Sequence, residues 1–285
     1  MRFSETALDQ LRCSDGVNRT IHIWQAPQPR AVILAIHGGL AHAGDFVTPA
    51  LYFLQQGVAT VSFDMHGHDG KKRVDVPGFQ TFLDDAVLFL AWVKARYPGL
   101  PIFVMGHSMG ALIATHLELG VFAHEPQIKG VILSSPYFVN AVKVPKILLA
   151  LSGVLAALVP KAKVPMDDIS THLTHDTRIA ERHAQDEKDQ LRASEASFRF
   201  ASGLLKAQAK LAGGLAAWKH PLFAVVAGND KLANAQASLA LLSTVPAPLR
   251  TLEHYPDNYH ENFNELNREA IFANIWRWMQ ALLAH

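Results

Sequence analysis

One serine stands in a pentapeptide that can make its hydroxyl a nucleophile. Ser108 lies in the sequence GHSMG, residues 106–110, after the apolar run 102–105 and before the helical pattern 111–117. A serine at a sharp strand-to-helix turn must adopt strained backbone angles, and the glycines beside it let neighbouring chain approach. The turn projects the hydroxyl above the sheet, where the helix N-terminus favours developing negative charge. The alternative is an ordinary turn with a capping serine, but the strand–motif–helix context favours a nucleophile.

A serine hydroxyl is a weak nucleophile until a base takes its proton, and the base needs an orienting carboxylate. Around this kind of turn the chain order is serine, then acid, then histidine. Asp230 follows the apolar run 222–226, at the end of a strand, and His260 lies in a loop before the last helical pattern. We therefore expect Ser108, Asp230 and His260 to form a catalytic triad.

Two nearby residues compete for these roles. His254 comes at the end of segment 249–252, too early for the loop after the strand. Asp257 is so close in sequence to His260 that the loop would have to double back to join them.

The same chemistry needs two backbone N–H groups aimed at the carbonyl oxygen as it becomes charged. Met109, the residue after the serine, is the first expected donor. The second is expected from the sequence HGGL, residues 37–40, with Gly39 as the best candidate. On its own, HGG could equally be a flexible turn, but beside the GHSMG motif it is the expected partner.

Short apolar runs recur along the chain, each closed by glycine or a polar turn. Such runs suit strands that are buried on both faces. Between them, residues 79–97 and 265–283 place apolar side chains at helical spacings of three and four. Strand then helix, repeated, predicts an α/β fold with a mostly parallel central sheet and helices on both faces. The expected strands are residues 21–24, 31–36, 58–63, 102–105, 131–133 and 222–226.

One region breaks this alternation. Residues 137–218 contain no strong strand pattern, but an apolar helix-like stretch followed by a polar one rich in His and Asp. We interpret this region as a helical cap inserted into a core formed by residues 1–136 and 219–285.

Residues 144–159 form the apolar stretch of the expected cap. This stretch fits two interpretations equally well: a cap helix that touches anionic lipid, or one that packs on the core. The cationic side chains around it are Lys143, Lys146, Lys161 and Lys163.

The composition of the chain limits its size class, its partners and its cellular compartment. The chain has 285 residues, 49% of them hydrophobic, which suffices for one large α/β domain with an insertion. The formal net charge of +1 gives no basic excess that would indicate nucleic acid. The single cysteine, Cys13, cannot form an internal disulfide and favours a reducing compartment. The sequence shows no signal-peptide pattern, and its longest apolar run, 147–159, is too short to span a bilayer. We therefore expect a cytoplasmic protein. Peripheral membrane contact through the cap stays an open alternative.

Taken together, these segments resemble the monoacylglycerol lipase and lysophospholipase branch of the α/β-hydrolases, a serine aminopeptidase-like superfamily. The most specific parts are YPGLPIFVMGHSMG at 97–110, the strand that ends in His37-Gly38, and HENFNE at 260–265. The resemblance covers nearly the whole chain. It implies the α/β-hydrolase fold, a hydrophobic helical cap that often faces membranes, and a Ser/Asp/His triad that matches the three residues above.

One loop departs from the family. Residues 66–72 read HGHDGKK, where the family often shows Gly-His-Gly-x-Ser. His66, His68 and Asp69 also raise the alternative of a zinc hydrolase, but two histidines and one acid do not close a zinc site without further ligands. We therefore expect no metal and no organic cofactor.

The function expected from the residues and the resemblance is a serine hydrolase that cleaves carboxylic esters of lipid-like substrates through an acyl-enzyme on Ser108. Monoacylglycerol and lysophospholipid are the expected substrate types. A short-chain carboxylesterase or amidase-type hydrolase is the alternative among enzymes. A non-catalytic binding protein on the same fold is a further alternative, although every triad position holds a competent residue.

Overall fold

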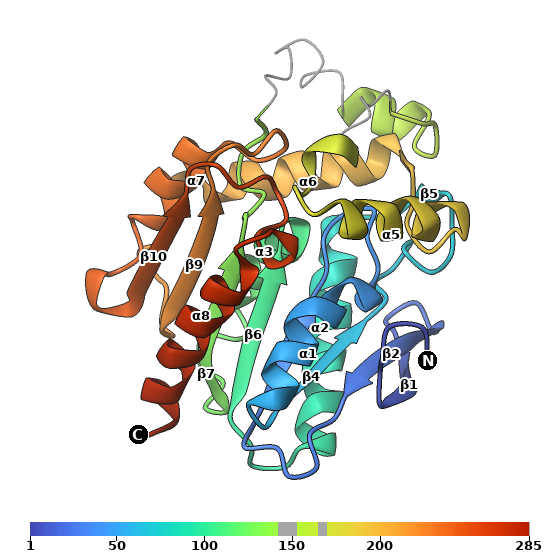
Figure 1. The fold of residues 1–285 in the computed structure, drawn as a ribbon. Helices are drawn as coiled ribbons and strands as arrows, with labels where there is room; N and C mark the ends of the chain where they lie inside the picture. The colour runs from blue at the N-terminus through green and yellow to red at the C-terminus, as the bar shows by residue number, and fades with distance from the viewer. Residues whose placement is uncertain (142–152, 165–169, 285) are drawn as a thin grey trace.

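The computed structural model describes residues 1–141, 153–164 and 170–284 (Figure 1). Its centre is an eight-stranded sheet in the order β1-β2-β4-β3-β6-β7-β9-β10. Strand β2 runs antiparallel to both of its neighbours, and all pairs from β4 to β10 are parallel. The strands are β1 (Ala7–Arg12), β2 (Asn18–Trp24), β3 (Ala31–Ile36), β4 (Val58–Phe63), β6 (Ile102–His107), β7 (Ile128–Ser134), β9 (Leu222–Ala227) and β10 (Arg250–Tyr255). The expected α/β fold with a mostly parallel sheet is confirmed.

The central strands form where the sequence is apolar without interruption. Every residue of β3, β4 and β9 is buried, since helices cover both faces of the sheet at these positions. The two edge strands were not predicted. β10, with the sequence RTLEHY, is only half-buried and carries polar side chains, so it lacks the continuous apolar run of a central strand.

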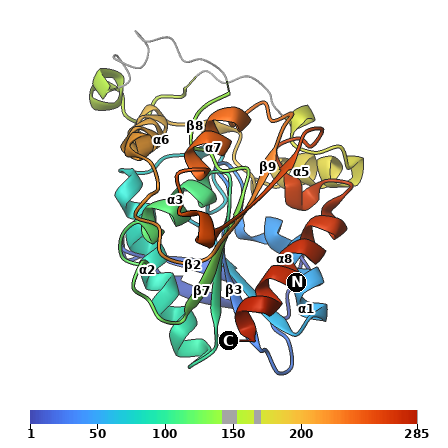
Figure 2. The same ribbon diagram turned by 90° about the vertical axis from the view of Figure 1, so that its left-hand side faces the viewer.

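Helices pack on the two faces of the sheet as two layers (Figure 2). α2 (Phe79–Arg96), α3 (Met109–Glu118) and α7 (Ala235–Leu242) lie on one face and contribute Phe89, Leu112 and Leu242 to one apolar cluster. α1 (Val47–Gln55) and α8 (Arg268–Leu283) lie on the other face, where Phe53 and Phe272 join a second cluster. Because the parallel strands all end at one edge of the sheet, the loops after β3, β6 and β9 come together there.

The region between β7 and β9 lies above that edge (Figure 1). It contains α5 (Thr177–Lys188), α6 (Phe198–Lys210) and one two-residue strand, β8 (Glu195–Ala196), which pairs with β5 (Arg73–Val74). Short 3-10 turns, numbered η1 to η5, lie at Ala43–Phe46, Ser170–His172, Leu211–Gly213, Ala247–Leu249 and Asn262–Asn264. The division into a core and a cap at residues 137–218 stays a prediction.

Most of the apolar stretch at 144–159 lies outside the described residues. Contact with anionic lipid and packing on the core therefore both stay open as interpretations of this stretch. Within the described ranges, no helix combines the length and the apolar character needed to cross a bilayer.

Candidate active site

Ser108 lies at the turn between β6 and α3, with a left-handed backbone of φ 55° and ψ −116°. A non-glycine residue in such a conformation costs about 1–3 kcal/mol. Close packing requires the glycines on either side of this turn. A Cβ at Gly106 would lie 2.6 Å from the Gly110 carbonyl oxygen, and a Cβ at Gly110 would overlap the Ile36 carbonyl oxygen. The Ser108 N–H donates to the carbonyl oxygen of Ser134 (2.9 Å). These contacts hold the Ser108 side chain at the wall of a pocket.

His260 and Asp230 form a bonded pair. Nδ1 of His260 lies 2.7 Å from Oδ2 of Asp230, and Oδ1 of Asp230 accepts from the N–H groups of Leu232 (2.8 Å) and Ala233 (3.0 Å). Burial would raise the pKa of Asp230, but His260 and the backbone donors lower it overall. An ionised Asp230 places the imidazole proton on Nδ1 and leaves Nε2 as an acceptor.

Nε2 of His260 is buried and has no hydrogen-bond partner among the described residues. His260 and Ser108 line the same pocket, so the structure brings together the three side chains expected from the sequence. The two competing residues lie elsewhere: His254, on β10, and Asp257 are both exposed, and neither is among the described residues that line the pocket.

The expected oxyanion donors, Gly39 and Met109, lie on neighbouring segments. A Cβ built on Gly39 would lie 3.6 Å from Sδ of Met109 and 3.8 Å from its Cβ, so the two residues are in contact range. Met109 is the first residue of α3, where N–H groups have no intrahelical acceptor. The Gly39 N–H likewise has no backbone acceptor within the described part of the chain. Neither amide is thus committed to a backbone acceptor among the described residues, as an oxyanion donor requires.

Two buried histidines fix the loop that carries Gly39. Nε2 of His37 accepts from the Met65 N–H (3.1 Å), and Nε2 of His68 accepts from the Leu40 N–H (3.1 Å). Burial lowers the pKa of His37 to about 4 and that of His68 well below its ordinary value. Both rings are therefore neutral at pH 7, as an acceptor nitrogen requires.

A third buried histidine, His107, precedes Ser108. Its ring centroid lies 4.9 Å from that of His260. Burial, followed by the nearby His260, lowers the pKa of His107 to about 4. The His107 side chain therefore adds no positive charge beside His260 at neutral pH.

The loop at 66–72 does not assemble a zinc site. Nδ1 of His68 pairs with the His66 carbonyl oxygen (3.0 Å) and Nε2 with Leu40, so both ring nitrogens are occupied. Nδ1 of His66 lies 3.2 Å from a carboxylate oxygen of Asp15, and Asp69 pairs with Lys71 (3.1 Å).

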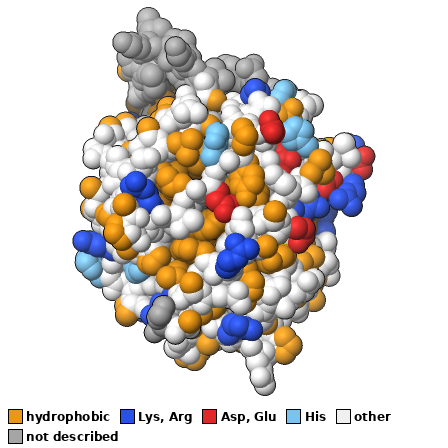
Figure 3. Space-filling model, turned by 60° about the vertical axis from the view of Figure 1, so that its left-hand side comes forward, with side chains coloured by type: hydrophobic (Ala, Val, Ile, Leu, Met, Phe, Trp, Pro, Cys, Tyr) orange, Lys and Arg blue, Asp and Glu red, His pale blue; other side chains and the backbone are white. Residues whose placement is uncertain are grey.

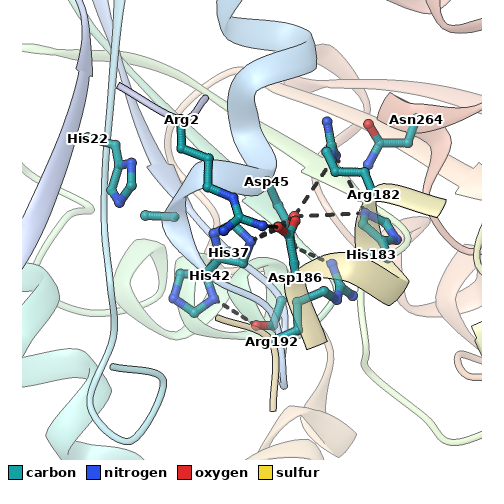
Figure 4. Close-up of polar contacts among 12 residues, drawn as sticks. Arg2, His22, His37, His42, Asp45, Arg182, His183, Asp186, Arg192 and Asn264 are labelled. Atoms are coloured by element: carbon teal, nitrogen blue, oxygen red, sulfur yellow. Dashed lines mark hydrogen bonds and ion pairs between the residues drawn. The ribbon is translucent and has the colours of Figure 1, made fainter. Parts of the chain in front are cut away.

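A different trio, His42, Asp45 and Asp186, places one ligand atom from each residue within 4.8 Å of the others. Its carboxylates already bind guanidinium groups (Figure 4). Arg2 donates to Asp186 (2.6 Å), and Arg192 donates to Asp45. The cations neutralise the acids, which favours a network of ion pairs over a divalent metal.

The pocket has a volume of about 470 Å³ and mixes two kinds of lining. Its apolar side chains include Leu40, Phe46, Pro49, Leu173, Leu232 and Phe263. Its charged and polar side chains besides Ser108 and His260 include Asp45, Lys163, His183, Glu187, Arg192 and Glu261. This charged wall could not be predicted from the sequence, because its members come from separate segments and no local pattern links them.

Comparison with known proteins places this site in a family. A family model described as "Serine aminopeptidase, S33" matches residues 27–267. Phospholipase YtpA of Bacillus subtilis is 32% identical over 253 residues, which cover 87% of this chain and 95% of the relative. A monoacylglycerol lipase of Mycolicibacterium smegmatis is 28% identical over 272 residues, which cover 93% of each protein.

Solved structures agree on the fold. A soluble variant of monoglyceride lipase from Saccharomyces cerevisiae, in complex with a substrate analog, has a TM-score of 0.82 at 19% identity and covers 99% of this chain and 98% of its own. The chain therefore belongs to the serine aminopeptidase S33 family of α/β-hydrolases, in its monoacylglycerol lipase-like branch, and is a carboxylic ester hydrolase.

Proposed function

We propose that this protein hydrolyses carboxylic esters of lipid-like monoacyl substrates, of the monoacylglycerol or lysophospholipid type, through an acyl-enzyme on Ser108. One observation carries the proposal. The Asp230–His260 pair leaves Nε2 of the imidazole without a partner among the described residues, in the same pocket as a serine on a strained turn.

In the proposed mechanism His260 takes the Ser108 proton as the hydroxyl attacks the ester carbonyl carbon. The N–H groups of Gly39 and Met109 stabilise the oxyanion, at about 3–4 kcal/mol per donor. His260 then gives its proton to the leaving alcohol oxygen. Water, deprotonated by His260, attacks the acyl-enzyme, and the proton returns to Ser108 as the acid leaves. Asp230 holds the imidazole in the required tautomer and stabilises its charged form.

Two observations support a lipid-like substrate. The relatives named above are a phospholipase and a monoacylglycerol lipase. The lining of the pocket of about 470 Å³ includes several apolar side chains, which suit an acyl chain.

A contact with a lipid surface through the cap is part of the proposal. In the described part of the cap the apolar side chains Val154, Leu158 and Val159 are exposed. Apolar side chains also spread over the face of the molecule that Figure 3 shows, with basic and acidic side chains among them. Amphipathic surfaces of this kind bind at lipid interfaces.

Substrate profiling tests the proposal. We expect turnover of long-chain monoacylglycerol or lysophospholipid vesicles to exceed turnover of soluble acetate esters, and Ser108→Ala to abolish both while circular dichroism stays unchanged. Equal or reversed preference would support the short-chain carboxylesterase alternative. Turnover retained by Ser108→Ala would refute the assignment of the nucleophile.

A further inference from the structure

Arg192 occupies the charged wall of the pocket, in the turn between α5 and β8 (Figure 4). Its Nη1 donates to Oδ2 of Asp45, and its Nη2 lies 3.5 Å from Oε1 of Glu261. The Arg192 and Asp45 side chains are each 12% exposed and that of Glu261 is 8% exposed. Because so little water screens these charges, each group depends on its partner.

The two carboxylates belong to two different candidate catalytic loops. Asp45 lies in η1, in the loop that follows β3 and carries Gly39. Glu261 comes directly after His260. The backbone makes a third link, since the N–H of Ala193 donates to the carbonyl oxygen of Leu40 (2.9 Å). One turn of the chain thus binds both the oxyanion loop and the histidine loop.

The Glu261 carboxylate is itself held in place. Its Oε2 accepts from Nδ2 of Asn264 (2.7 Å), and its backbone N–H donates to the carbonyl oxygen of Leu173 (2.8 Å). Burial would raise the pKa of Glu261, but His183 and Arg192 lower it overall, so the acid is ionised at neutral pH. Removal of the Arg192 charge would leave two buried carboxylates without their shared cation, which disrupts both loops.

We propose that Arg192 is a positioning residue for ester hydrolysis, which sets the distance between the loop of Gly39 and the loop of His260. The inference rests on the proposed function, because it takes these loops as the oxyanion and base loops. The substrate carbonyl must reach the Gly39 amide while Ser108 reaches His260, so a small shift between the loops weakens both interactions in the transition state. A misplacement of about 1 Å can cost about a hundredfold in rate. Apolar contacts are non-directional, so they tolerate such a shift better than hydrogen bonds to the transition state do, and ground-state binding of the substrate changes little.

Steady-state kinetics on a small soluble ester, p-nitrophenyl butyrate, test this. For Arg192→Met we expect kcat to fall about a hundredfold with KM within about threefold of wild type. For Arg192→Lys we expect an intermediate loss of about tenfold, because an ammonium lacks the planar fork that reaches both carboxylates. The matched control is Arg199→Met in α6, which removes an ion pair with Asp75 outside the pocket and should leave kcat unchanged.

Arg192→Met with kcat within about threefold of wild type would overturn the inference, as would a loss carried by KM alone. If circular dichroism shows that Arg192→Met does not fold, Arg192→Lys decides, and an unchanged kcat in that variant overturns the inference. An active wild type with insensitive Arg192 variants refutes this inference alone. A wild type that neither turns over esters nor reacts with a fluorophosphonate refutes the proposed function, and the inference with it.

Discussion

Replacement of Asp230 by asparagine should inactivate the protein through the tautomer of His260. Oδ1 of Asp230 accepts from two backbone donors, the N–H groups of Leu232 and Ala233, so the amide oxygen of the Asp230→Asn variant is expected to keep that place. The NH₂ group of the new side chain would then face Nδ1 of His260, which lies 2.7 Å from Oδ2 in the wild type. Nδ1 would have to accept, so the proton would move to Nε2, and no lone pair would remain there for the Ser108 hydroxyl.

The expected loss in kcat is about 10⁴-fold, the size that the same change of tautomer causes in other serine hydrolases. At about 1.36 kcal/mol per tenfold, this corresponds to about 5 kcal/mol of transition-state stabilisation. The assay is kcat on a soluble ester at pH 7, with Asp257→Asn as the matched control because Asp257 is exposed. The melting temperature should hardly change, since both backbone bonds persist. An Asp230→Asn protein within about tenfold of wild type would refute the reasoning.

Two further predictions concern stability. Gly110→Ala should lower the free energy of unfolding by more than about 4 kcal/mol, because its Cβ would overlap the Ile36 carbonyl oxygen. Gly213→Ala is the matched control, since a Cβ there meets open space. Equal midpoints of urea unfolding for the two variants would contradict this prediction. The pKa of His107 is about 4 in the folded protein, against an ordinary 6.5. Between pH 4 and 6.5 the unfolded chain therefore binds more protons than the folded one. The stability that neutral His107 contributes is lost as pH falls through this window. The difference in unfolding free energy between wild type and His107→Gln should therefore shrink by up to about 3 kcal/mol across the window, and a constant difference would count against the buried neutral state.

The parts of the fold that sequence predicts are those that leave a local pattern. The apolar runs predict the central strands β3 and β4 at residues 31–36 and 58–63, the bounds the structure has, because burial on both faces requires an uninterrupted apolar run. The edge strands β1 and β10 were missed, since a strand with one covered side tolerates polar residues along its length.

The same distinction applies to the candidate site. The positions of Ser108, Asp230 and His260 could be expected because each stands in a recognisable place relative to a strand or helix, and their order is fixed by topology. The ion pair between Asp45 and Arg192 joins residues 147 positions apart, and neither residue stands in a motif. Such pairs depend on how the segments after β7 pack over the sheet, which no local spacing encodes.

The most direct test of the central claim is the reaction of the purified protein with a fluorophosphonate probe, followed by identification of the modified residue by mass spectrometry. We expect a single adduct on Ser108 in the wild type and none in Ser108→Ala. Labelling should also be slowed strongly in His260→Gln, because the hydroxyl then lacks its base. An unlabelled but folded wild type, or equal labelling of Ser108→Ala, would contradict the claim that Ser108 is an activated nucleophile.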